Sequence, residues 1–240
     1  MSSYFCKQEN AMALKSYARP LFLLGAILFG AGITFVILHY AIGEAKPEKR
    51  GLMVPIIPIK IPNPNGAPDS TFKTVGAFSF VDQTGSKVDR KSLNGKIWVA
   101  DVFFTTCGSI CPKLSAGLQR VQEAFKADPD VQLISFTVDP DYDSLPILRS
   151  YADEYGAIDT QWHFLTGNKT DLYRVETEEF FFSHTEDEDK TIKFVHDGKL
   201  RLVDKEGRFR GYFYDGTDAS DIDSLIAHIK LLKREYAQIQ

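Results

Sequence analysis

An uncharged, apolar run near the start of the chain limits how the rest can fold. Residues 21–42 read LFLLGAILFGAGITFVILHYAI and contain no Asp, Glu, Lys or Arg. A stretch of about 20 such residues can cross the hydrocarbon core of a bilayer, and it exceeds the apolar region of an ordinary signal peptide. No cysteine at its end offers a site for lipid attachment. We therefore predict an uncleaved signal-anchor, with one transmembrane helix over residues 21–42.

The charges on the two sides of this run do not fix its orientation. Three basic residues precede it and three follow it closely: Lys7, Lys15, Arg19, Lys46, Lys49 and Arg50. A first span with a short basic N-terminus usually leaves that terminus in the cytoplasm. We therefore expect residues 1–20 to form a cytoplasmic tail and the C-terminal part to face the periplasm or an equivalent space. Cys6 in this tail is interpreted as a solvent-exposed bystander rather than a palmitoylation site.

Prolines separate the predicted span from the rest of the chain. Six of them lie between residues 43 and 70: Pro47, Pro55, Pro58, Pro62, Pro64 and Pro68. Such density forbids helix and favours an extended, semi-rigid chain. We predict a spacer over residues 43–70 and one folded domain over residues 71–240.

The composition is that of a globular protein and excludes nucleic acid as a partner. Hydrophobic residues make up 44% and charged residues 25%, which is too apolar for a disordered chain. The net charge is −4, and the sequence contains no large basic stripe. Binding to phosphate backbones needs such a basic surface.

Strand and helix patterns alternate along residues 71–240. Residues 96–104 (KIWVADVFF) and 131–138 (VQLISFTV) are nearly continuous apolar runs, as in strands covered on both faces of a parallel sheet. Between them, residues 112–126 place apolar side chains at helical spacing. The other expected elements are a hairpin at 78–81 and around Val88, helices at 144–155 and 169–179, a short strand at 163–165, a hairpin at 199–203 and 208–213, and a final helix. This order predicts an α/β domain with a thioredoxin-like central sheet flanked by helices.

Two cysteines, Cys107 and Cys111, lie where a central strand leads into a helix. Such loops lie beyond the carboxyl ends of the strands, where open α/β sheets form their sites. We place Pro112 at the first helical position and Cys111 at about the N-cap, where the helix dipole favours a thiolate. Two thiolates at this spacing can close a disulfide or chelate one ion. Soft sulfur ligands select copper(I) or zinc, and copper(II) requires an additional imidazole. The structural alternative is that both are small buried hydrophobes.

A third ligand has to come from one of the five histidines. His39 at the membrane boundary, His163 on a short strand and His228 on the final helix all have simple structural interpretations. His184 lies in an acidic, aromatic segment (EEFFFSHTEDEDK), where solvation explains it. His196 precedes the late hairpin, which we expect to pack beside the central strand and to bring its leading loop toward the cysteines. Position in the sequence leaves this choice open.

An ordered set of motifs resembles the Sco/SenC family of copper-binding proteins. The matching segments are residues 104–112 (FTTCGSICP), 135–140 (SFTVDP), 162–167 (WHFLTG), His196, 202–207 (LVDKEG) and 211–217 (GYFYDGT). The resemblance implies a thioredoxin-like fold in which Cys107, Cys111 and His196 are the copper ligands. It also implies a role in building the copper centre of a respiratory cytochrome oxidase, whose copper-site subunit would be the partner. One departure is Val195, which stands where the family often has an acidic residue before the histidine.

The predicted location is a bacterial inner membrane, crossed once, with the copper-binding domain in the periplasm. Three functions remain open at this point. The chain is a metallochaperone that hands over copper, or a periplasmic thiol–disulfide oxidoreductase that reduces the cysteines of the oxidase copper site. The third is a non-catalytic copper or redox sensor, with the acidic segment 176–189 as a docking surface.

Asp139 is interpreted as a turn or N-cap residue, with support of the site or partner docking as the less favoured roles.

Overall fold

The computed structural model describes residues 54–57, 73–186, 194–196 and 198–239, and for a few of these, including 184–186 and 194–196, only the backbone. The predicted cytoplasmic tail, the predicted membrane span and most of the predicted spacer lie outside these ranges. Among the described residues, no helix is both long enough and apolar enough to cross a bilayer. The division of the chain into tail, span, spacer and domain therefore stays a prediction.

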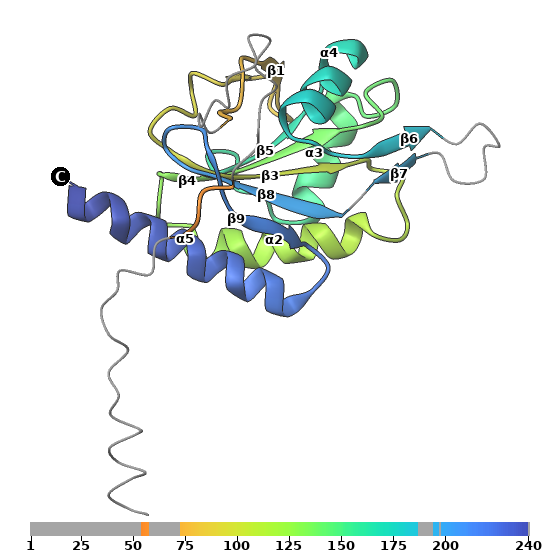
Figure 1. Ribbon diagram of the computed structural model, residues 1–240. Helices are drawn as coiled ribbons and strands as arrows, with labels where there is room; N and C mark the ends of the chain where they lie inside the picture. Colours follow the sequence, from red (N-terminus) through yellow and green to blue (C-terminus); the bar gives the residue numbers. More distant parts are fainter. Residues whose placement is uncertain (1–53, 58–72, 187–193, 197, 240) are drawn as a thin grey trace, which may run out of the picture. The chain divides into compact units, whose positions relative to one another are not determined.

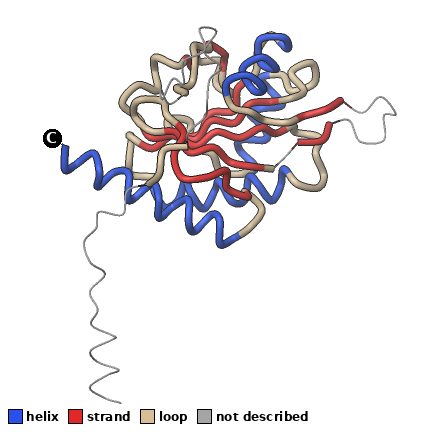
Figure 2. Tube along the Cα trace, viewed as in Figure 1, coloured by secondary structure: helices blue, strands red, loops and turns tan. Residues whose placement is uncertain are grey.

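Within the described residues, five strands form a central mixed sheet in the order β5-β4-β3-β8-β9. The parallel strands are β3 (Ile97–Phe103), β4 (Val131–Thr137) and β5 (Trp162–Leu165). β8 (Lys199–Val203) runs antiparallel to β3, and β9 (Phe209–Asp215) runs antiparallel to β8. Every residue of β3 and β4 is buried, which explains their nearly continuous apolar sequences. Helices cover both faces of this sheet (Figure 1, Figure 2).

Two helices connect the parallel strands. α2 (Cys111–Phe125) joins β3 to β4, and α3 (Leu145–Glu154) joins β4 to β5. Right-handed crossovers place both on one face of the sheet, where the Ser115 and Tyr151 hydroxyl groups hydrogen-bond at 2.8 Å. α5 (Ala219–Ile239) packs beside α2 on that face, and α4 (Lys169–Arg174) lies on the opposite face (Figure 1).

Aromatic side chains fill the core on the face that α4 covers. The cluster contains Phe78, Phe80, Trp98, Phe136 and Phe180. Neighbouring rings in this cluster have centroids between 5.1 and 6.4 Å apart, in the range where aromatic pairs attract one another. Phe80 comes from β1 (Ser79–Val81), which pairs with β2 (Lys87–Asp89) as the sequence predicted. This hairpin therefore covers one face of the sheet.

The predicted α/β fold with a central sheet flanked by helices is confirmed, with two local corrections. The helix predicted over residues 169–179 is α4 followed by a π-helical turn, η1 (Val175–Glu179), closed by the N–H of Phe180 on the Val175 carbonyl. Residues predicted as loop form a second hairpin, in which β6 (His184–Glu186) pairs with β7 (Phe194–His196). Strands of three residues are too short for an alternating pattern to show them, and β6 and β7 also lack a turn motif such as DQTG at residues 82–85, which marks the hairpin of β1 and β2.

Part of the predicted spacer packs on the sheet. Ile56 forms an antiparallel bridge with Arg210 of β9, and the N–H of Ile57 donates to the Phe209 carbonyl at 2.9 Å. Val54 is 1% exposed, and its carbonyl accepts from Nε of Arg210 at 2.9 Å. Residues 54–57 thus extend the edge of the sheet, and compact packing begins at about Met53.

Candidate metal and thiol site

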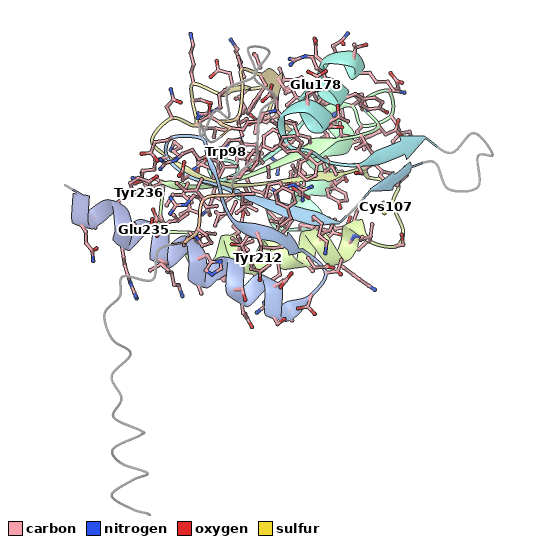
Figure 3. All side chains as sticks on the ribbon, in the orientation of Figure 1. Trp98, Cys107, Glu178, Tyr212, Glu235 and Tyr236 are labelled. Atoms are coloured by element: carbon pink, nitrogen blue, oxygen red, sulfur yellow. The ribbon has the colours of Figure 1, made fainter. Side chains whose placement is uncertain are left out.

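The loop from β3 to α2 carries both predicted cysteines at the carboxyl ends of the parallel strands. The N–H of Cys107 donates to the Phe104 carbonyl at 3.2 Å, which closes a turn just after β3. α2 then begins at Cys111, with Ile110 as its N-cap. Figure 3 labels Cys107 on this loop, at the end of the sheet where β6 and β7 lie. This is the position at which open α/β sheets form their sites.

A buried carboxylate fastens the start of this loop to the neighbouring strand. Asp143 is fully buried and accepts from the backbone N–H of Thr105 at 3.3 Å and from the hydroxyl groups of Thr105 and Thr137. Burial raises the pKa of Asp143, against the hydrogen bonds that favour its carboxylate. Asp139 forms the turn after β4, where its carbonyl accepts the N–H of Asp143 at 2.9 Å. The sequence pattern singled out Asp139 in the same segment and gave no signal for Asp143.

The two cysteine sulfurs have different environments. The backbone N–H of Cys111 donates to Sγ of Cys107 at 3.4 Å, and the Ser109 hydroxyl lies 3.8 Å from the same sulfur. Cys107 is partly exposed, whereas Cys111 is 0% exposed and belongs to the core. No disulfide joins Cys107 to Cys111. The loop therefore holds a reduced pair in which the sulfur of Cys107 accepts the N–H at the start of α2.

These environments separate the pKa values of the two thiols. Partial burial raises the pKa of Cys107, but the N–H of Cys111 and the other hydrogen bonds outweigh it, so that this pKa lies below its ordinary value. Burial and the hydrogen bond with Cys107 raise the pKa of Cys111 well above its ordinary range. The prediction of a favoured thiolate at Cys111 is therefore wrong. Cys111 is the first helical residue, Pro112 is the second, and the helix N-terminus stabilises the thiolate of Cys107 instead.

A buried carboxyl group, Asp101, lies on the face of β3 that α2 covers. Its Oδ1 accepts the Ser135 hydroxyl at 2.5 Å, and that hydroxyl accepts Nε1 of Trp162 at 3.0 Å. Burial raises the pKa of Asp101 to about 7, and its negative charge contributes to the raised pKa of Cys111. The sequence indicated this residue only as one polar position inside an apolar strand.

Asp101→Asn is expected to remove a loss of stability that the reduced, metal-free protein shows between pH 4 and 7. Because the folded-state pKa lies above the unfolded value of 3.8, the contribution of Asp101 is fully present below pH 3.8 and is lost as pH rises toward 7. The free energy of unfolding of the variant, measured relative to that of wild type, should therefore rise by roughly 2–4 kcal/mol between pH 4 and pH 8. Urea unfolding at the two pH values measures this gain, with Asp223→Asn on the surface as the control. A difference that does not change with pH would contradict the assignment.

The backbone brings the His196 strand to the cysteine loop. β8 pairs with β3, with Arg201 opposite Ala100, so β8 begins beside the end of β3 that leads to the cysteines. At Gly198, two residues after His196, an added Cβ would lie 2.6 Å from Cδ1 of Ile110, the residue before Cys111. The expected approach of this segment to the cysteines is thus confirmed for the backbone at Gly198.

The other histidines have structural partners or lie outside the described residues. Nδ1 of His163 is 2.9 Å from Asp82 Oδ2, and Nδ1 of His228 is 2.6 Å from the Tyr214 hydroxyl. His39 belongs to the undescribed N-terminal part. His184, predicted as solvated loop, is on β6 and directly opposite His196 on β7. The sequence offered no signal for this pairing.

The chemistry of the pair suits a soft metal ion. Two sulfurs in one turn match the preference of copper(I) for thiolate, and an imidazole would add affinity for copper(II). Among the described side chains, no group of three or more His, Cys, Asp and Glu residues converges on one point. The described side chains do not include those of His184 and His196. Glu176, the first residue of the acidic segment considered for docking, is 0% exposed and belongs to the interior.

Comparisons with known proteins point to one family. A family model described as SCO1/SenC matches residues 66–231. The chain is 32% identical over 160 residues to the SCO1 protein homolog of Bacillus subtilis strain 168, which covers 65% of this chain and 81% of that relative. It is also similar to the structure of BsSco, which is described as a Sco-family cytochrome c oxidase assembly protein with a disulfide switch. This match has 31% identity and a TM-score of 0.59, and it covers 67% of this chain and 94% of BsSco. Copper-bound ScoI of Arabidopsis thaliana matches at 25% identity and a TM-score of 0.55, over 66% and 99%.

Proposed function

Since this chain belongs to the SCO1/SenC family, we propose that it binds copper through Cys107, Cys111 and His196 and delivers the ion to the copper centre of a respiratory cytochrome oxidase. Copper is then a cargo that is bound and handed on, and the chain acts as a metallochaperone rather than an enzyme. The observation that carries this proposal is the contact of Gly198 with Ile110, because it joins the His196 strand to the cysteine loop.

The thiol environments support binding of a soft ion. The sulfur of Cys107 is deprotonated at modest cost, because the N–H of Cys111 already stabilises its charge. The thiol of Cys111 loses its proton only when a cation replaces it, since its pKa is raised. Copper uptake should therefore release protons from the site. Arabidopsis thaliana ScoI, a relative that is 25% identical, has been solved with copper bound.

The second candidate function is thiol–disulfide exchange with the oxidase copper-site subunit. The separated pKa values favour it, because they define an attacking and a resolving thiol. The Cys107 thiolate would attack a disulfide of the partner and form a mixed disulfide. The Cys111 sulfur would then displace the partner, leaving a Cys107–Cys111 disulfide and a reduced partner dithiol. A periplasmic reductase would restore the pair, and the disulfide switch described for BsSco is a related precedent.

The proposed location follows from the N-terminal sequence. Residues 21–42 would anchor the chain once in a bacterial inner membrane, with residues 1–20 in the cytoplasm. The domain would then lie in the periplasm, on a spacer that starts at residue 43. The proposed copper site would then lie on the periplasmic side of the membrane.

An anaerobic copper titration of the reduced chain tests the proposal. We expect one copper(I) per chain, with stoichiometric binding lost in Cys107→Ser and Cys111→Ser and weakened about 10- to 100-fold in His196→Ala. Cys6→Ser is the matched control and should bind like wild type. Failure of the wild-type chain to retain copper, together with cysteine-dependent disulfide exchange, would favour the oxidoreductase instead. Equal affinity of His196→Ala and wild type would remove His196 from the ligand set.

A further inference from the structure

The cysteine loop leaves the sheet where the ladder between β3 and β4 ends. The register of these strands ends with Phe103 opposite Thr137, and the N–H of Val138 donates to the Phe103 carbonyl at 2.9 Å. Residues 104–110 then connect β3 to α2. If the two sulfurs are to keep one arrangement, contacts other than the ladder have to hold this loop.

The carboxylate of Asp143 holds the start of the loop. It is 0% exposed, and its two oxygens lie 3.4 and 3.3 Å from the backbone nitrogen of Thr105. One oxygen also accepts the Thr105 hydroxyl, and the other accepts the Thr137 hydroxyl. A buried carboxylate needs such hydrogen bonds, and those to a charged acceptor are stronger than neutral ones. Asp143 therefore connects the loop to β4.

Asp143 is itself held by the turn after β4. Its N–H donates to the Asp139 carbonyl at 2.9 Å, and the N–H of Asp139 donates to the Thr137 hydroxyl oxygen at 3.0 Å. α3 begins two residues after Asp143, at Leu145. The carboxylate that meets the loop thus belongs to a turn that hydrogen bonds hold against the end of β4.

One planar peptide group joins Asp143 to Cys107. The N–H of Thr105, which Asp143 accepts, and the carbonyl of Phe104 belong to the same peptide group. That carbonyl accepts the N–H of Cys107 at 3.2 Å. Because a peptide group is planar, a contact that orients its N–H also orients its carbonyl. The Cys107 sulfur in turn accepts the N–H of Cys111 at 3.4 Å, so a series of contacts runs from Asp143 to both cysteines.

We propose that Asp143 is a positioning residue for copper, and that it fixes Cys107 against Cys111 before the ion arrives. This inference rests on the proposed copper-binding function and adds a residue on which the affinity depends. Asp143 acts on the ion through the peptide group between Phe104 and Thr105. Loading then needs little rearrangement of the loop, and a site that is ordered in advance binds more tightly because less conformational freedom is lost on binding.

Substitutions at Asp143 should change copper(I) affinity according to the acceptor that they leave. Asp143→Ala should weaken binding about 10- to 100-fold, the range expected when a group that orients metal ligands is removed. Asp143→Asn should stay within about threefold of wild type, because its amide oxygen still accepts the donors of Thr105. Asp141→Ala is the matched control, since Asp141 lies on the same turn with its side chain 74% exposed and pairs with Lys169 at 3.4 Å on the surface.

Two measurements on the full chain separate positioning from a general loss of stability. Anaerobic competition with a chromophoric copper(I) chelator gives the affinity, at a temperature where circular dichroism shows the variants folded. Hydrogen exchange of the metal-free chain reports on the loop. In Asp143→Ala the amides of Thr105 and Cys111 should exchange about tenfold faster or more. The amide of Leu114, which donates to the Ile110 carbonyl at the start of α2, should stay as protected as in wild type.

Thr105→Val is the second loop variant, because it removes one donor and leaves the carboxylate in place. It should weaken copper(I) binding about three- to tenfold. A folded Asp143→Ala or Thr105→Val with wild-type affinity, or a loss of affinity without faster exchange at Thr105 and Cys111, would overturn the positioning role and leave the proposed function standing. Equal losses in Asp143→Ala and Asp143→Asn would also overturn it, since the retained oxygen would then not matter. A wild-type chain that retains no copper(I) would overturn the proposed function itself.

Discussion

Iodoacetamide is expected to alkylate Cys107 at least about a hundredfold faster than Cys111 in the reduced, metal-free chain at neutral pH. Alkylation needs an accessible thiolate. Cys107 is partly exposed, and the N–H of Cys111 at 3.4 Å stabilises its charge. Cys111 is 0% exposed, and burial raises its pKa well above the ordinary range. A thiolate of low pKa is also a weaker nucleophile. On a logarithmic scale, this offsets less than half of the advantage that Cys107 gains from its larger thiolate fraction.

Peptide mapping by mass spectrometry after timed quenching measures the two rates in one sample and separates them from Cys6. In urea the rates at Cys107 and Cys111 should converge, because unfolding removes both the burial and the hydrogen bond. Ser109→Ala should slow Cys107 only modestly, since the Ser109 hydroxyl is the more distant donor, at 3.8 Å. Equal rates in the folded chain would contradict the expected difference between the two thiols, and faster alkylation of Cys111 would reverse the order of attack and resolution.

The second large effect is expected at Arg210. Arg210→Met should lower the free energy of unfolding by about 3–5 kcal/mol, because it takes one of two arginine partners from the buried Asp204 and the ion pair from Glu235. The Arg210 side chain is 3% exposed and pairs with Asp204 at 3.0 Å and Glu235 at 2.5 Å, whose side chains are 0% and 13% exposed. It also donates to the Val54 carbonyl from Nε at 2.9 Å and from Nη2 at 2.6 Å.

Urea unfolding of Arg210→Met measures this loss, with Arg149→Met as the control. Arg149 makes two ion pairs with exposed acids on the surface, so its replacement should cost less than about 1 kcal/mol. Hydrogen exchange adds a local readout, because the amide of Ile57 should lose protection when the segment 54–57 detaches. A loss as small as that of the control would mean that this segment contributes little to the domain.

Much of the central sheet could be predicted from local patterns. The apolar runs that became β3 and β4 identify buried parallel strands, and the helical spacing between them identifies α2. Periodicity fails for β6 and β7, because three residues hold too few alternations to separate a strand from a loop and no Gly, Pro or Asn at residues 187–193 marks a turn. It also misses η1, since a π-turn differs from an α-helix by one hydrogen-bond step at the end.

The site was predicted in part. The cysteine pair stands out because a CxxxCP motif at a strand-to-helix junction is rare and chemically specific. The motif did not reveal which thiol is the more acidic, because this depends on the residue at which α2 begins. A start at Cys111 directs the first helical N–H to the sulfur of Cys107. Asp143 was missed because the groups that donate hydrogen bonds to it come from two other segments, and Asp101 because an apolar strand hides a single carboxyl group.

By itself the sequence determined the properties that neighbouring residues share: the apolar run of 21–42, the buried strands, and the placing of Cys107 and Cys111 at one junction. These depend on local spacing and composition, which the chain carries wherever it folds. Tertiary structure decided which thiol is acidic, the pairing of His184 with His196, and the contact of residues 54–57 with Arg210. Each of these joins segments whose approach depends on how the whole sheet packs, because burial and hydrogen-bond partners are properties of the folded interior rather than of the motif.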